Sequence, residues 1–331
     1  MGAINENSHS GAFRVNRIGE TVGSSTINEL LDDHAVYFFQ GNVENLGTLP
    51  GGNKSFASGI NSFGVVVGDS NISPLEVRAF RKDMRNDDSE MQNLGTLGGN
   101  FSAAEAVNDN GIVVGCSKTQ TNDQRAFIWT EFEGMQPLAT FNSHPYDCAL
   151  DINKKNVIVG YSLIPNLPGI RPTLWLLGTR HLVNLGDLGG GEGKASSINN
   201  KGDVVGYSTT TQGEQHAFLL IKAMNHNMID LGVLNEGDFS SQAWGINNRK
   251  QAVGWSTGSE NIGSAFVWDR EHGMRDLNKI VKYGMAPWKK LEVAQSINDR
   301  GEIVGRGLLK RRDPQGNYLN HAFKLVPLCV D

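Results

Sequence analysis

Residues 198–206 read Ile-Asn-Asn-Lys-Gly-Asp-Val-Val-Gly, and this stretch decides the fold. Its segment from Asn199 to Gly202 lies between two short apolar runs. A glycine adopts a positive φ without steric cost, and an asparagine side chain can bond the backbone of its own turn. The pattern therefore predicts a tight hairpin. The β-branched run after the turn is too short for a helix and predicts a strand.

The same pattern occurs seven times along the chain. Seven residues after each repeated asparagine comes a glycine, and four residues before each lies an alanine. The asparagines are 45 to 51 residues apart. They are Asn16, Asn61, Asn108, Asn153, Asn199, Asn247 and Asn298. Self-similarity at a nearly fixed period is typical of repeat architectures, so the chain is built from seven similar units of about 47 residues.

Each unit has room for four short strands, which is the content of one propeller blade. We therefore predict an all-β fold, a seven-bladed β-propeller in a single domain over residues 1–331. A β-solenoid is the alternative, although no capping segments are present. The seventh unit ends without its fourth run. Counting back from Asn16 aligns Met1–Ile4 with the Leu-Gly-Thr-Leu of other units, so this segment is predicted to supply the outer strand and close the ring. The repeated alanine is expected at the axis, where only a small side chain fits.

Composition excludes several classes of protein. The 331 residues carry a net charge of −5, and no basic stripe typical of nucleic-acid binding is present. No run of 18 apolar residues predicts a membrane span, and the N-terminus lacks the apolar segment of a signal peptide. Cys116, Cys148 and Cys329 are odd in number and widely spaced. We interpret them as small buried hydrophobic residues rather than a disulfide framework or metal ligands.

The third run of several units carries a further motif. It reads His216-Ala217-Phe218 and His321-Ala322-Phe323, with a relaxed form at Arg125-Ala126-Phe127. Together with Leu-Gly-Thr-Leu-Gly-Gly at 94–99, these residues make the chain resemble the HAF-repeat family. The resemblance implies a bacterial repeat protein outside the cell or exported from it. It implies no reaction and no catalytic residues.

Function is expected where the units differ. The residue after the repeated glycine is aromatic in three consecutive units, as Tyr161, Tyr207 and Trp255, and aromatic faces suit sugar or peptide ligands. Two loops between units are also irregular. They hold His144 and Tyr146 before the fourth unit and Trp288 and Lys289 before the seventh, with Trp244 as a neighbour. Packing between blades is the alternative role for the three aromatic residues.

These residues predict a non-enzymatic interaction module, a monomer that binds a protein or a glycan near the central channel. A carbohydrate-active hydrolase or lyase is the second hypothesis, because paired carboxylates can act as acid and base. Its candidate residues are Asp147, Glu292, Glu105 and Glu192. A purely structural surface protein is the third. No metal-ligand spacing or nucleotide motif is present, so no cofactor and no metal are expected.

Overall fold

The structure is a computed structural model that describes residues 1–5, 8–27, 32–86, 88–141, 145–178, 181–222, 227–258, 263–313 and 315–328. Nearly all of its regular structure is β-strand, as expected. In the described residues, one helical turn, α1 (Leu277–Ile280), follows the strands of the sixth repeat. In the part of the chain described, no helix is long and apolar enough to cross a membrane.

Antiparallel strands follow one another through the seven repeats. The first three repeats contain β1 (Ser10–Val15), β2 (Thr21–Thr26), β3 (Asp33–Phe39), β4 (Asn42–Gly47), β5 (Ser55–Ile60), β6 (Val65–Ser73), β7 (Glu76–Asp83), β8 (Gln92–Asn93), β9 (Gly98–Val107), β10 (Val113–Thr119), β11 (Gln124–Thr130) and β12 (Gly134–Pro137). The fourth and fifth contain β13 (Asp147–Ile152), β14 (Val157–Leu163), β15 (Ile170–Leu176), β16 (His181–Asn184), β17 (Gly189–Ile198), β18 (Val204–Thr210), β19 (Gln215–Leu220) and β20 (Met228–Asp230). The last two contain β21 (Asp238–Ile246), β22 (Ala252–Gly258), β23 (Ser264–Asp269), β24 (Gly273–Asp276), β25 (Trp288–Ile297), β26 (Ile303–Arg312) and β27 (Tyr318–Leu325).

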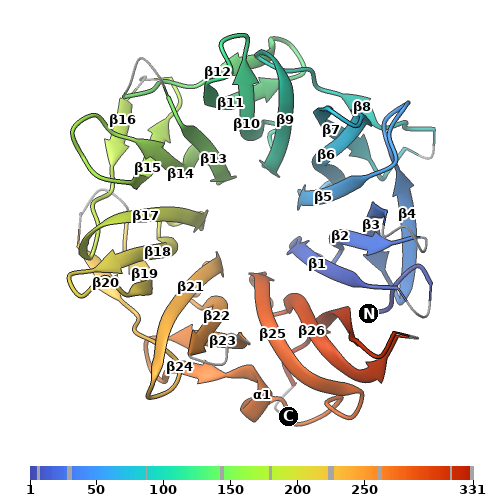
Figure 1. Cartoon of the computed structure of the whole chain (residues 1–331), viewed down its shortest axis with the longest axis vertical. Helices are drawn as coiled ribbons and strands as arrows, with labels where there is room; N and C mark the ends of the chain where they lie inside the picture. The colour runs from blue at the N-terminus through green and yellow to red at the C-terminus, as the bar shows by residue number, and fades with distance from the viewer. Residues whose placement is uncertain are drawn as a thin grey trace.

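The sheets surround a common centre, with the first strand of each repeat innermost (Figure 1). Two sheets each combine neighbouring repeats, because a parallel pair joins Val77 of β7 to Phe101 of β9 and Gln215 of β19 to Ser240 of β21. The remaining sheets comprise β1–β4, β13–β16 and β25–β27. Short antiparallel strands in sequence order therefore form a ring with one repeat following the next.

The repeated asparagines form a continuous ring of hydrogen bonds. The Oδ1 atom of Asn153 accepts the backbone N–H groups of Lys155 at 2.9 Å and Val157 at 3.1 Å, which fixes its own turn. Its Nδ2 donates to the backbone oxygen of Asn199 at 3.1 Å. The same donation links each asparagine to the next through all seven, ending with Asn298 Nδ2 on the oxygen of Asn16. The predicted hairpin turns are confirmed, and they also join the repeats.

The repeated alanine does not line the axis, and that prediction was wrong. All seven alanines are fully buried, and each lies in a hydrophobic cluster between neighbouring repeats; Ala57 packs with Val22 and Phe80. The backbone partner of Ala57 is Gly68. A Cβ at Gly68 would overlap the carbonyl oxygen of Phe56. The alanine and the glycine thus let two strands approach closely inside the sheets.

The N-terminal segment takes the predicted register but forms no strand. Ile4 donates its N–H to Ser25 Oγ at 3.0 Å, as Leu49 does to Ser70 Oγ in the next repeat. Ser10 Oγ donates to the Gly2 oxygen at 3.0 Å and accepts the Ala322 N–H from β27 at 3.0 Å. The segment therefore reaches the last repeat through side-chain bonds rather than a backbone ladder.

A disulfide joins Cys116 of β10 to Cys148 of β13, with a Cα–Cα distance of 4.8 Å. The interpretation of these two residues as unlinked hydrophobic residues was wrong. They lie 32 residues apart in sequence and on different repeats, so no local spacing indicates the link. Cys329 lies outside the described residues.

Candidate functional site

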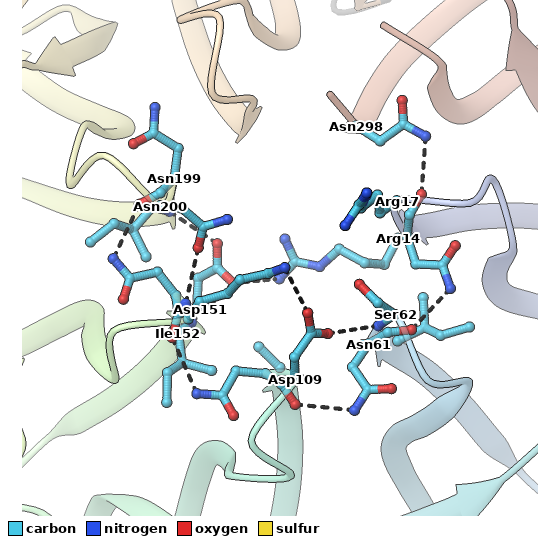
Figure 2. A pocket seen from close by; sticks show the side chains of 18 of the residues that line it. Arg14, Arg17, Asn61, Ser62, Asp109, Asp151, Ile152, Asn199, Asn200 and Asn298 are labelled. Carbon is cyan, nitrogen blue, oxygen red and sulfur yellow. Dashed lines mark hydrogen bonds and ion pairs between the residues drawn. The ribbon is translucent and has the colours of Figure 1, made fainter. Parts of the chain in front are cut away.

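The asparagine turns surround a cavity of ≈190 Å³ on one face of the ring (Figure 2). Arg14 of β1 extends across the centre, and its Nη2 lies 3.2 Å from Asp151 Oδ1 of β13. The other oxygen of Asp151 accepts Ser197 Oγ at 2.7 Å and the Ile198 N–H at 3.0 Å. This ion pair joins the first and fourth repeats through the middle of the channel.

The loops between repeats lie at the other ends of the innermost strands, away from the asparagine turns. Two positions in the repeat meet at boundaries between repeats. The residue after the glycine of one repeat faces the residue before the alanine of the next. Cys116 meets Cys148 in this way, and Lys194 Nζ lies 4.7 Å from the centre of the Tyr161 ring. Side chains at these positions therefore decide the chemistry of each boundary.

Asp69, Tyr161 and Lys194 each interact electrostatically with Glu105, and we call these four residues the channel cluster. Burial raises the pKa of Glu105, and the positive charges of Arg14 and Lys194 oppose this rise. Burial also raises the pKa of Asp69 to about 7, and the charge of Glu105 adds to the rise. Burial lowers the pKa of Lys194, against the charges of Glu192 and Glu105. Perturbed carboxyl groups of this kind are typical of functional sites.

The aromatic candidates divide into a buried layer and an exposed one. Tyr161 and Tyr207 are buried, and burial raises the pKa of both, that of Tyr207 to about 12. Tyr146 is 48% exposed, and its ring centre lies 5.8 Å from that of Tyr161. Gln124 Nε2 donates to the Tyr161 hydroxyl at 3.1 Å. Trp255 is half-buried. Tyr146 is thus the most exposed of these four rings, and Tyr161 packs beneath it.

The candidates in the sixth and seventh repeats lie elsewhere on the ring. Trp288 packs edge-on against Phe323, with ring centres 6.1 Å apart, so this partly buried ring packs against the core. Lys289 is exposed, and its Nζ lies 3.6 Å from the centre of the Tyr318 ring. Trp244 is 37% exposed and occupies a β-bulge, the position that Glu105 takes in the third repeat. His144 lies outside the described residues.

The four candidate acids have different surroundings. Asp147 is fully buried at the start of β13; burial raises its pKa, and the charge of Arg125 opposes the rise. Burial raises the pKa of Glu292, against the charges of Arg306 and Lys290. Glu192 is exposed, and its negative charge favours a higher pKa for Lys194 and for Tyr207. Glu105 and Glu192 therefore share Lys194, whereas Asp147 and Glu292 have separate charged partners.

Sequence reasoning missed Asp69, Arg14 and Asp151. A signal for Asp69 was present, because it follows the repeated glycine just as Tyr161 does. Arg14 and Asp151 also share one repeat position, two residues after the alanine, where other repeats carry small residues such as Gly59 and Ser197. Opposite charges at a position otherwise occupied by small residues are a signal for a pair across the channel.

Solved structures provide the comparison, since no family model and no curated protein matches the sequence. The β-propeller domain of the trilobed protease from Pyrococcus furiosus, described as having an open velcro topology, aligns with 98% of this chain and 99% of its own. The TM-score is 0.59 and the identity 10%. The fold is a β-propeller.

Two longer proteins contain a similar propeller. A puromycin-hydrolysing peptidase of Mycobacterium tuberculosis matches with a TM-score of 0.58 and 12% identity, over 87% of this chain and 47% of that protein. TolB from Acinetobacter baumannii matches with a TM-score of 0.52 and 6% identity, over 80% of this chain. The chain spans 61% of the TolB length. At these identities the similarity shows the fold and transfers no activity.

The raised pKa of Asp69 predicts a dependence of stability on pH. The pKa rises from 3.8 to about 7 on folding, so the protonated acid is favoured in the folded state and stability falls as pH rises from about 4 to about 7. Asp69→Asn removes this loss. The free energy of unfolding of this variant minus that of the wild type is expected to be about 1 to 2 kcal/mol larger at pH 8 than at pH 5, after allowance for solvent screening. Urea unfolding at both pH values measures it, and an equal effect at both would contradict the assignment.

Proposed function

We propose that this protein is a non-enzymatic binding module that holds a protein or a glycan at the mouth of the channel formed by the loops between repeats. The observation that carries the proposal is Tyr146, an exposed ring that packs on the buried Tyr161, whose own ring lies 4.7 Å from the ammonium group of Lys194. An aromatic face beside a fixed cation suits a sugar ring that bears an acidic group, or an acidic peptide. Trp244, which is 37% exposed, and Trp255 are proposed as further ligand contacts in the sixth repeat.

A glycan array combined with affinity capture from a lysate tests this function. Tyr146→Ala and Lys194→Met are expected to weaken binding of a captured ligand at least tenfold, because each removes one element of the recognition surface. Phe132→Ala is the matched control, since Phe132 is 97% exposed in a turn between β11 and β12. Absence of any ligand in both assays, or equal loss in the control, would contradict the proposal.

A second candidate function is a carbohydrate-active hydrolase or lyase, and the coupling of Asp69 with Glu105 favours it. A carboxyl group with a pKa near 7 can donate a proton at neutral pH while a neighbouring carboxylate accepts one. Glu292, Glu192 and Asp147 remain further candidates for this role. Glu105→Gln distinguishes the two functions. If the protein is a hydrolase or lyase, this substitution should abolish turnover of a bound glycan. If it is a binding module, neither the wild type nor the variant should turn the glycan over.

We propose further that each repeat is one blade, giving a seven-bladed propeller in a single domain over residues 1–331, with Met1–Ile4 as the outer element of the last blade. The ring of seven asparagine bonds and the register of Ile4 support this count. The motifs around Ala217 and Ala322 support membership of the HAF-repeat family, and with it a place outside the cell. A monomeric state is part of the same proposal.

A further inference from the structure

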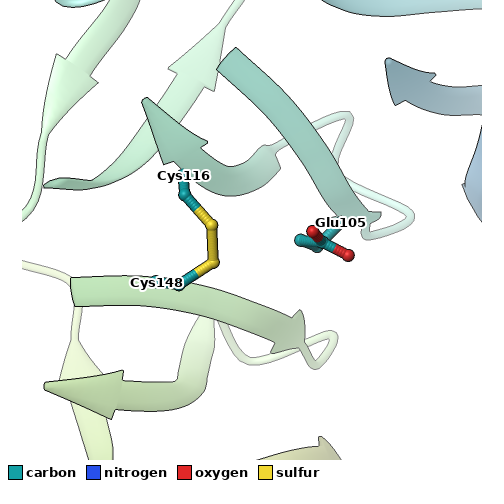
Figure 3. Close-up of side chains that lie close together, drawn as sticks. All are labelled: Glu105, Cys116 and Cys148. Atoms are coloured by element: carbon teal, nitrogen blue, oxygen red, sulfur yellow. A yellow bond between two sulfur atoms is a disulfide. The ribbon is translucent and has the colours of Figure 1, made fainter. Parts of the chain in front are cut away.

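The carboxylate of Glu105 lies near the disulfide between Cys116 and Cys148 (Figure 3). One ligand atom of each residue lies within 4.8 Å of those of the other two. The three residues come from β9, β10 and β13, and the two cysteines are 6% and 2% exposed. Thiolate sulfur and carboxylate oxygen are both ligands that proteins offer to zinc.

We propose that reduction of this disulfide by a dithiol creates a Zn²⁺ site with Cys116 Sγ, Cys148 Sγ and the Glu105 carboxylate as ligands. The inference goes beyond the proposed function and does not depend on it. In the oxidised protein both sulfur atoms are in the S–S bond and carry no charge, so they cannot hold the ion. The redox state of the pair therefore decides whether the site exists.

The chemistry balances in two steps. A dithiol gives two electrons and two protons to the S–S bond, which breaks to leave two thiols, and the dithiol becomes a disulfide. Zn²⁺ then displaces both thiol protons into solvent, so binding is coupled to proton release. Two thiolates and one carboxylate around Zn²⁺ give a net charge of −1. The positive charges of Arg14 and Lys194, which already act on Glu105, offset that excess.

The fold leaves room for the required movement. Tetrahedral Zn–S bonds of about 2.3 Å place two sulfur atoms about 3.8 Å apart, farther than in a disulfide. Cys116 and Cys148 lie on strands of different sheets with no ladder between β10 and β13, so the strands can separate slightly. Tyr161 packs with the two cysteines in a buried apolar cluster, and Leu150 and Ile170 pack against that cluster. Three protein ligands leave the fourth position of zinc for water, as in open sites.

Wild-type protein in its two redox states provides the main experiment, which needs no variant. One sample is kept oxidised, and the other is reduced with dithiothreitol and freed of reductant without oxygen. Zn²⁺ is titrated into each against a chromogenic chelator, and Co²⁺ is then used as a spectroscopic probe. We expect one ion per reduced chain, with a sulfur-to-cobalt charge-transfer band, and none in the oxidised chain. Absence of binding by the reduced chain, or equal binding by both, would overturn the proposal.

Variants then identify the ligands. In reduced protein, Cys116→Ser should abolish the charge-transfer band or halve it, and Glu105→Gln should weaken Zn²⁺ binding at least tenfold while the band remains. Cys329→Ser is the matched control for thiols, and Glu192→Gln is the control for a nearby acid. Both should bind as wild type does. Loss of the ion in Cys329→Ser with retention in Cys116→Ser would place the metal elsewhere and reject this site.

Discussion

Replacing one asparagine of the ring, Asn153→Ala, is expected to lower the free energy of unfolding by about 3 kcal/mol. Asn153 is 4% exposed, and its side chain makes three hydrogen bonds, two inside its own turn and one to the Asn199 oxygen. A buried hydrogen bond contributes about 1 kcal/mol, and the backbone groups that lose their partner in this variant remain shielded from water. Urea unfolding followed by circular dichroism measures the loss.

Two further substitutions separate the parts of that effect. Asn153→Asp keeps the oxygen that accepts the Lys155 and Val157 N–H groups but loses the donor to Asn199, so we expect an intermediate loss when the carboxylate is charged. Lys155→Ala changes an exposed residue of the same turn and should alter stability by less than about 0.5 kcal/mol. If the alanine and aspartate variants lost the same stability, the bond between repeats would account for the whole effect and the turn bonds for none.

Removal of the disulfide is the second large effect. Cys148→Ser opens a link across 32 residues, and the loop entropy returned to the unfolded chain corresponds to about 3 to 4 kcal/mol. The loss of stability should mainly weaken the packing between the third and fourth repeats, because Cys148 packs there with Cys116 and Tyr161. Chemical unfolding under non-reducing conditions measures the change.

The reduced wild-type protein is the control for this prediction. Without metal, it should unfold close to the Cys148→Ser variant, because both lack the link. Cys116→Ser should behave in the same way, and combining the two substitutions should add little, since one bond is lost in each case. A double variant far less stable than either single variant would show that the cysteines act through packing rather than through the link.

Much of the candidate site followed from positions in the repeat. Tyr161 and Tyr207 were identified because they break a pattern, and the structure places Tyr161 beneath the exposed Tyr146. Glu105 was identified as a neighbour of the irregular loops, but its position within 4.8 Å of the disulfide sulfur atoms was not. Its surroundings depend on which strands of different repeats lie side by side, and residue spacing within one repeat carries no such information.

The sequence by itself determined the strands and the turns, because alternating short apolar runs and the Asn-x-x-Gly turn act over a few residues. It also determined the register of Ile4, since five repeats use the serine at the same position to hold the corresponding backbone N–H. Only the tertiary structure decided which side chains meet between repeats. Arg14 pairs with Asp151 and Cys116 with Cys148 because the ring closes and brings distant strands together. The tertiary structure also decided the role of the repeated alanine. This residue packs between repeats, because a small side chain is needed where the sheets pack closely and not at the open axis.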